Sequence, residues 1–160
     1  MTQNSQDNLT SVLAERPLNV LQACILQVFS AVLTAVTTMH GYDHYLELGR
    51  LLQQQTGSFE QFIASRAISV LVALLLAWLF YQGRNWARLF FIAFFVVNLG
   101  CIVWSLSSAG KEIVSHLGDT DSLISLLQMV IALVVSCLLL TKKSGAWFLA
   151  VKRARAEAQA

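Results

Sequence analysis

Long apolar runs separated by short polar segments dominate this chain. The four runs cover residues 18–39, 62–81, 87–107 and 122–141. Each has about 20 residues, which is the length an α-helix needs to cross the roughly 30 Å hydrocarbon core of a bilayer. Arg66 lies near one end of its run, where a long charged side chain can reach the lipid headgroups. The pattern therefore predicts four transmembrane helices.

A soluble four-helix bundle is the alternative, and it requires a polar outer face on every helix. Residues 70–80 and 89–97 are apolar on all sides. Charged residues make up 12% of the chain, about half of their usual share in a soluble domain. We therefore expect a single all-α domain over residues 1–160, an integral membrane four-helix bundle.

The first run differs from the others because it carries a polar stripe. At 100° per residue, its amide and hydroxyl side chains project into an arc of roughly 160°. The stripe consists of Asn19, Gln22, Gln27, Ser30, Thr34, Thr37 and Thr38. Lipid offers no hydrogen-bond partners, so such a stripe should face other helices or a polar cavity. We expect this span to be the most enclosed of the four.

The distribution of basic residues predicts the orientation. The short turn at residues 81–88 carries two arginines and no acid. With this turn and both termini on one side, that side holds eight of the eleven bases and three of the nine acids. Basic loops stay in the cytoplasm, so both termini are predicted to be cytoplasmic. Residues 1–16 would form a flexible cytoplasmic tail, and residues 142–160 a basic tail that includes a short amphipathic helix.

Local signals mark several helix ends. Ser58 and Gln61 are spaced as a capping box that would start the second span. Gly83 can end that span in the left-handed conformation, and Asn85 can start the next one. In the first external loop, residues 40–61, apolar side chains recur at helical spacing, which favours a further helix on the membrane surface.

Two sets of residues are candidates for helix packing. Small side chains repeat every fourth residue along the second run and would allow close approach of another helix; they are Ser65, Ser69, Ala73 and Ala77. The amides of Gln27, Asn98 and Gln128 fall at similar depths in three runs. Such amides either bond to one another and hold the helices together, which we favour, or line a polar pathway or substrate site at the midplane.

Basic and aromatic residues at the predicted cytoplasmic surface are candidates for anchoring at the lipid headgroups. Tryptophan is typical of membrane interfaces, and each base near an anionic surface contributes about 1 kcal/mol. The set consists of Arg84, Trp86, Arg88, Lys142, Lys143 and Trp147.

Motifs that carry chemistry are scarce. His40, His44, Glu47 and His116 lie in the predicted external loops, and imidazoles four residues apart beside a carboxylate can bind zinc or copper. Gly41 weakens the helix that would align them, so we expect solvated side chains and no metal site. The chain has no P-loop, dinucleotide glycine pattern, GxSxG or HExxH motif. We therefore expect no enzyme activity and no cofactor. The orientation in the membrane accounts for the positions of the basic residues, so we expect no nucleic-acid partner.

The sequence GRNWAR at residues 83–88, followed by a span and later by SGAWF at residues 144–148, resembles a loose group of small four-pass bacterial inner-membrane proteins. Members of that group carry a G-[KR]-N-W-A-R turn and an S-x-x-W-F element after the last span. The resemblance covers the second half of the chain. It implies a multi-pass architecture in the bacterial inner (cytoplasmic) membrane, and it implies no activity.

Two classes of function remain. The first is a non-catalytic interaction protein that binds another membrane protein, or a second copy of itself, within the lipid bilayer. One version resembles the membrane immunity proteins that neutralise membrane-targeting toxins. The second is a small transporter or channel that uses the polar stripe of the first span. The spans lack the helix breaks and the membrane-embedded charges that transporters use, which favours the first class.

Overall fold

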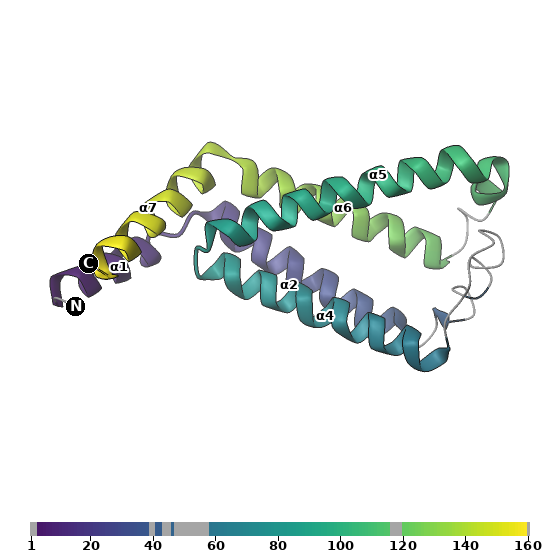
Figure 1. The fold of residues 1–160 in the computed structure, drawn as a ribbon, viewed down its shortest axis with the longest axis horizontal. Coiled ribbons are helices and arrows are strands. Elements are labelled where there is room, and N and C mark those ends of the chain that lie inside the picture. The colour runs from purple at the N-terminus through teal and green to yellow at the C-terminus, as the bar shows by residue number, and fades with distance from the viewer. Residues whose placement is uncertain (1–2, 39–40, 43–45, 47–57, 116–119, 160) are drawn as a thin grey trace.

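The computed structural model of this chain describes residues 3–38, 41–42, 46, 58–115 and 120–159. The elements of these residues are helices: α1 (Gln3–Ala14), α2 (Leu18–Thr38), α4 (Phe59–Tyr81), α5 (Asn85–Ser115), α6 (Thr120–Leu140) and α7 (Lys142–Gln159). The helices α2, α4, α5 and α6 run side by side along the long axis (Figure 1). Each is long and apolar enough to cross a membrane. The prediction of four long apolar helices is confirmed.

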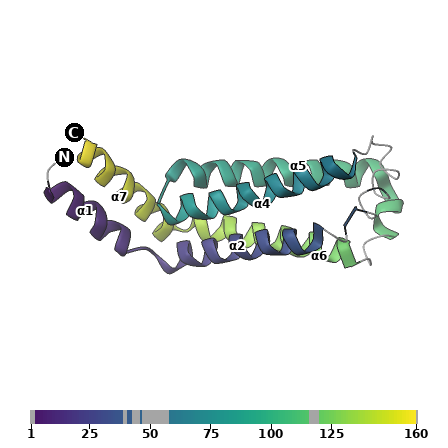
Figure 2. The same cartoon turned by 90° about the horizontal axis from the view of Figure 1, so that it is seen from below.

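The four long helices form two layers, one of α4 and α5 and the other of α2 and α6 (Figure 2). Around the bundle, α2 contacts α4 and α6, and α5 contacts the same two helices less extensively. Of the four spans, α2 has the largest share of buried residues, 28%, and α5 the smallest, 11%. The expectation that the first span is the most enclosed is therefore confirmed.

The polar stripe of α2 faces the neighbouring helices in part, since Gln22 is exposed. Gln128 of α6 donates from its Nε2 to the Oγ1 of Thr34 at 2.9 Å. Asn19 donates from its Nδ2 to the Oγ1 of Thr141 at 3.1 Å. Gln27 is buried. These hydrogen bonds join α2 to α6 and to Thr141, the residue between α6 and α7. A partner on another element stabilises an amide inside an apolar bundle.

The predicted ends of α4 have the expected geometry, whereas Asn85 does not cap α5, because it is the first residue of that helix and its Oδ1 has no hydrogen-bond partner. Ser58 and Gln61 form a capping box at the start of α4. At its end Gly83 adopts a φ of 72°, and the N–H groups of Gly83 and Arg84 bond to the carbonyls of Phe80 and Leu79. These two bonds are those of a Schellman motif. The next helix, α5, begins two residues later, so α4 and α5 form a tight antiparallel hairpin.

The segments outside the spans differ in part from the expectation. The N-terminal residues, predicted as a flexible tail, form α1. The basic tail, for which the sequence predicts a short amphipathic helix, is helical over 18 residues as α7. The two lie side by side beyond one end of the bundle, here called the terminal end (Figures 1 and 2). The apolar residues of α1 and α7 pack against each other. This pairing cannot be predicted from either segment alone. The helix α5 also continues to Ser115, beyond the predicted end of its span.

Candidate anion-binding cavity

The turn between α4 and α5 packs directly on α7. Gly83 is buried, and a Cβ added there would lie 3.0 Å from the Cη2 of Trp147 and 3.0 Å from the Cγ1 of Val151. The left-handed backbone and the close approach of α7 both require glycine at this position. The glycine of the GRNWAR sequence therefore holds the turn against the SGAWF segment.

A group of hydroxyls directs the chain from α6 into α7. The Oγ of Ser144 donates to the carbonyl of Leu138 at 2.9 Å and lies 2.9 Å from the Oγ1 of Thr141. The same Thr141 oxygen accepts the N–H of Ser144, and Asn19 of α2 donates to it. Ser144 is fully buried. The serine of SGAWF thus sets the angle at which α7 leaves the bundle.

Trp147 lies inside the protein, whereas the prediction placed it at the lipid headgroups. It is 5% exposed, and its Nε1 donates to the carbonyl of Val12 in α1 at 2.9 Å. The guanidinium carbon of Arg16 lies 3.6 Å from the ring centroid of Tyr81 and 5.7 Å from that of Trp147. The presence of α1 is the physical reason, because it covers the face of α7 that would otherwise meet the membrane.

The side chain of Arg88 is also partly buried. Its Nη1 donates to the carbonyl of Leu139 at 3.5 Å, and its guanidinium carbon lies 5.3 Å from the ring centroid of Phe148. Arg88 therefore connects α5, the end of α6 and α7. The prediction of headgroup anchoring fits Arg84, Trp86, Lys142 and Lys143 better, since these side chains are exposed.

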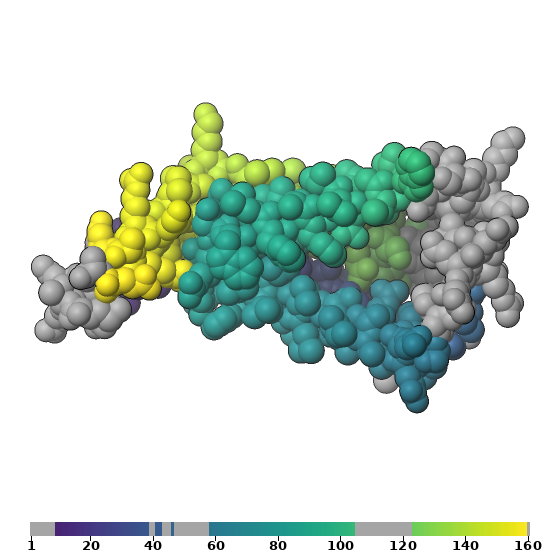
Figure 3. Space-filling view, viewed as in Figure 1, coloured from purple at the N-terminus to yellow at the C-terminus, as the bar shows by residue number. Residues whose placement is uncertain are grey.

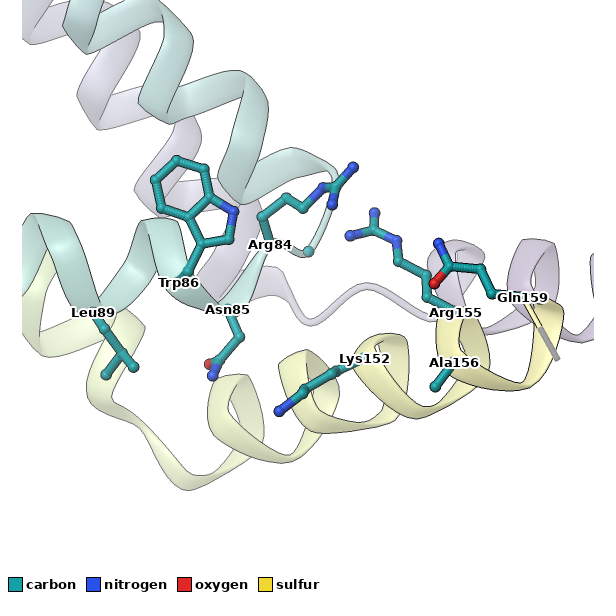
Figure 4. A pocket seen from close by; sticks show the side chains of 9 residues that line it. Arg84, Asn85, Trp86, Leu89, Lys152, Arg155, Ala156 and Gln159 are labelled. Carbon is teal, nitrogen blue, oxygen red and sulfur yellow. The ribbon is translucent and has the colours of Figure 1, made fainter.

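A cavity of about 400 Å³ opens beside this junction, between the turn and the outer half of α7 (Figure 4). The turn and the start of α5 contribute Gly83, Arg84, Asn85, Trp86 and Leu89, and α7 contributes Lys152, Arg155, Ala156 and Gln159. The contributing positions of α7 follow a spacing of three and four residues, so they share one face of the helix. That spacing is visible in the sequence, but only the fold shows that the α4–α5 turn lies opposite.

The cavity is strongly basic. Of the described residues that line it, three are bases and none is acidic. The guanidinium groups of Arg84 and Arg155 approach each other across the opening (Figure 4). Burial and, second, the positive charge of Arg84 lower the pKa of Arg155. Arg155 is held in place by a hydrogen bond from its Nη2 to the carbonyl of Gln82. Such an arrangement can bind an anion, which would relieve the repulsion between the two arginines.

The three predicted midplane amides do not meet. Gln27 is buried in α2 and Gln128 bonds to Thr34, whereas Asn98 is exposed on α5 and donates to the carbonyl of Phe94 in its own helix at 2.8 Å. The prediction placed Asn98 at the same depth as the other two amides, but residues 96–104 of α5 are all exposed in the structure. Similar depth in the membrane is therefore not sufficient for contact, because the face of each helix must also match.

The predicted ridge of small residues on α4 is only partly used. Ala77 is buried, and its carbonyl accepts a hydrogen bond from the Sγ of Cys24 in α2 at 3.4 Å. Ala73 is half-buried, and Ser65 and Ser69 are exposed. The ridge therefore packs on α2 at the terminal end of α4, and its residues are exposed towards the opposite end.

The residues of the considered metal site, His40, His44, Glu47 and His116, lie outside the described residues, as does most of the predicted surface helix in residues 40–61. In the part of the chain that the structure describes, His, Cys, Asp and Glu side chains form no group of three able to hold a metal ion. The metal site therefore stays a hypothesis.

Comparisons of the chain with protein-family models, with curated proteins and with solved structures found no match. The resemblance drawn from the GRNWAR and SGAWF sequences stays a prediction. What the structure adds is that these two segments, about 60 residues apart in the chain, pack on each other, and that the GRNWAR segment lines the basic cavity together with the second half of α7.

Proposed function

We propose that this protein is a non-catalytic, multi-pass membrane protein that binds a transmembrane helix of another protein molecule through the outer half of α5. In this proposal the terminal end faces the cytoplasm of a bacterial cell, in agreement with the excess of bases there. The partner is a second copy of this chain or a different membrane protein. Binding to a membrane-targeting toxin would be one case of the latter.

The observation that carries the proposal is the exposure of α5. Near the terminal end α5 is packed, since Ala87 is fully buried and Phe91 is 6% exposed. In contrast, residues 96–104 are all exposed, on every side of the helix. The surface is hollowed between α4 and α5 in this region, and atoms of α2 are visible at the bottom (Figure 3). The outer half of α5 thus has room for a helix from outside the chain.

The residues on this half of α5 suit a helix partner. Asn98 exposes an amide in the middle of a span, where lipid offers no hydrogen bond and a neighbouring helix does. Gly100 has no atom within 4 Å of the place where a Cβ would be, so a second helix can approach its backbone closely. Two residues of the polar stripe of α2, by comparison, bond to other parts of the chain, Thr34 to Gln128 of α6 and Asn19 to Thr141, which supports a packing role for the stripe over a transport pathway.

The cysteines of the chain provide a direct test. Cys101 is exposed on the outer half of α5, Cys137 is exposed on α6, and Cys24 is buried. One variant keeps Cys101 alone (Cys24→Ala with Cys137→Ser), and its control keeps Cys137 alone (Cys24→Ala with Cys101→Ser). Each is labelled in native membranes with a photoactivatable maleimide and irradiated.

We expect a single cross-linked product from Cys101 and little from Cys137. A product of twice the 17.7 kDa chain identifies a second copy, and another mass identifies a different membrane protein. Replacing Asn98 by Leu should reduce cross-linking several-fold while the thermal stability of the purified chain stays unchanged, because Asn98 has no bond to another helix of its own chain. Equal cross-linking from both cysteines, or none from Cys101, would refute the proposal.

A further inference from the structure

The basic cavity has a chemistry that the proposed function does not use. Arg84 comes from the α4–α5 turn, and Lys152 and Arg155 come from α7, so two elements far apart in the chain place three bases on one opening. The Nη2 of Arg155 is bonded to the carbonyl of Gln82, which keeps its charge at the wall of the cavity. Like charges held close together favour the binding of an anion between them.

The start of α5 adds to the positive potential. The helix begins at Asn85, which lines the cavity, and the dipole of a 31-residue helix is positive at this end. Its first backbone N–H groups lack partners within the helix, and that of Ala87 bonds to the carbonyl of Arg84 just before the helix. Backbone N–H groups and guanidinium groups together are the usual ligands of a phosphate group.

The volume of the cavity and the residues at its opening indicate which class of anion fits. About 400 Å³ is within the range of small-ligand pockets and exceeds what a single inorganic ion needs. Trp86 and Leu89 line the same opening, and both are exposed on α5, one of the membrane-spanning candidates. A ligand with a charged group in the cavity could therefore lay an apolar part along α5.

We propose that this cavity binds the phosphate group of an anionic phospholipid, with Arg84, Lys152 and Arg155 as its ligands. The phosphate lies between the α4–α5 turn and α7, and the acyl chains follow the surface of α5. The site is independent of the helix-binding half of α5, which lies further along the same helix. Bound lipid would fix the α1–α7 pair relative to the bundle, because the three bases come from both sides of that junction.

The test compares a matched pair of charge substitutions in the full chain. The cavity variant is Lys152→Gln, and the control is Arg153→Gln. Both bases are exposed and neighbours on α7, and each substitution removes one positive charge, but only Lys152 lines the cavity. Arg155 is left in place because it also bonds to the α4–α5 turn. Circular dichroism and gel filtration establish that both variants are folded.

Retention of phosphatidylglycerol and of phosphatidylcholine is measured by native mass spectrometry after purification in mild detergent. We expect the natural chain to retain phosphatidylglycerol preferentially, the cavity variant to retain about tenfold less, and the control to match the natural chain. Equal losses in the cavity variant and the control would mean diffuse attraction to the surface charge, and would overturn the proposal. So would retention that does not depend on the headgroup.

A second arm separates a lipid headgroup from a free phosphate. The thermal stability of the detergent-solubilised chain is measured with glycerol 3-phosphate and with inorganic phosphate. Stabilisation by these soluble anions that is lost in the cavity variant, without selective lipid retention, would assign the site to a soluble phosphate and refute the lipid. The absence of both effects would show that the cavity binds no phosphate.

Discussion

At the scale of single residues, the two segments that stood out in the sequence owe their composition to one junction. Gly83 allows the turn to touch α7, Ala87 is fully buried below it, and Arg88 reaches the last turn of α6. Ser144 sets the start of α7, and Phe148 is fully buried. Residues read as anchors at the membrane surface are thus, in part, residues of an internal interface.

Gly83 offers the sharpest test of that junction. Gly83→Ala should lower the free energy of unfolding by about 1–2 kcal/mol from the left-handed backbone alone, and more from the contacts with Trp147 and Val151. Thermal unfolding in detergent measures the change. The matched control is Gly100→Ala, where a Cβ meets no atom within 4 Å, so its stability should be unchanged or slightly higher. Equal destabilisation by both would contradict this account of the turn.

At the scale of elements, the helices divide into a packed set and one loosely held member. The helix α2 packs against α4 and α6, and α1 packs against α7, whereas the buried residues of α5, among the side chains described up to residue 104, lie near its start. The pairing of α1 with α7 depends on an indole hydrogen bond and on a buried apolar face of α7 that includes Val151 and Ala154. This pair extends the core of the bundle at the terminal end, because Trp147, Phe148 and Val151 belong to the same cluster of buried residues as the long helices.

Trp147→Phe tests how α1 is held. The substitution keeps an aromatic ring and removes the hydrogen bond to the carbonyl of Val12, so the contact should weaken by about 1 kcal/mol. Hydrogen exchange of the backbone amides of α1 should then become several-fold faster, with little change in the long helices. Trp86→Phe serves as the control, because Trp86 is exposed. Unchanged exchange in α1 would show that Trp147 does not hold the pair together.

At the scale of the whole molecule, the charge distribution and the fold make the same division between the two ends. The starts of α2 and α5, the ends of α4 and α6, and the whole of α1 and α7 gather at the terminal end, which carries most of the bases (Figure 1). The proposed orientation places this end, and with it the basic cavity, in the cytoplasm.

Cysteine accessibility tests the orientation. In a chain without its natural cysteines, Lys143→Cys at the terminal end should react with a membrane-impermeant maleimide only after the cells are permeabilised. Glu60→Cys, at the start of α4 and at the opposite end, should react in intact cells. Both positions are exposed, so the bilayer alone decides the difference. The reverse pattern would invert the molecule, and labelling of both in intact cells would argue against four spans.

The sequence by itself determined the features that depend on neighbours along the chain. The long apolar runs, the capping box at Ser58 and the left-handed Gly83 were predicted, because hydropathy and caps act within one helix. Only the tertiary structure decided which faces meet. It covered Trp147 with α1, left Asn98 exposed, and placed Lys152 and Arg155 opposite Arg84. Those outcomes depend on the angle at which whole helices cross, and no single segment carries that information.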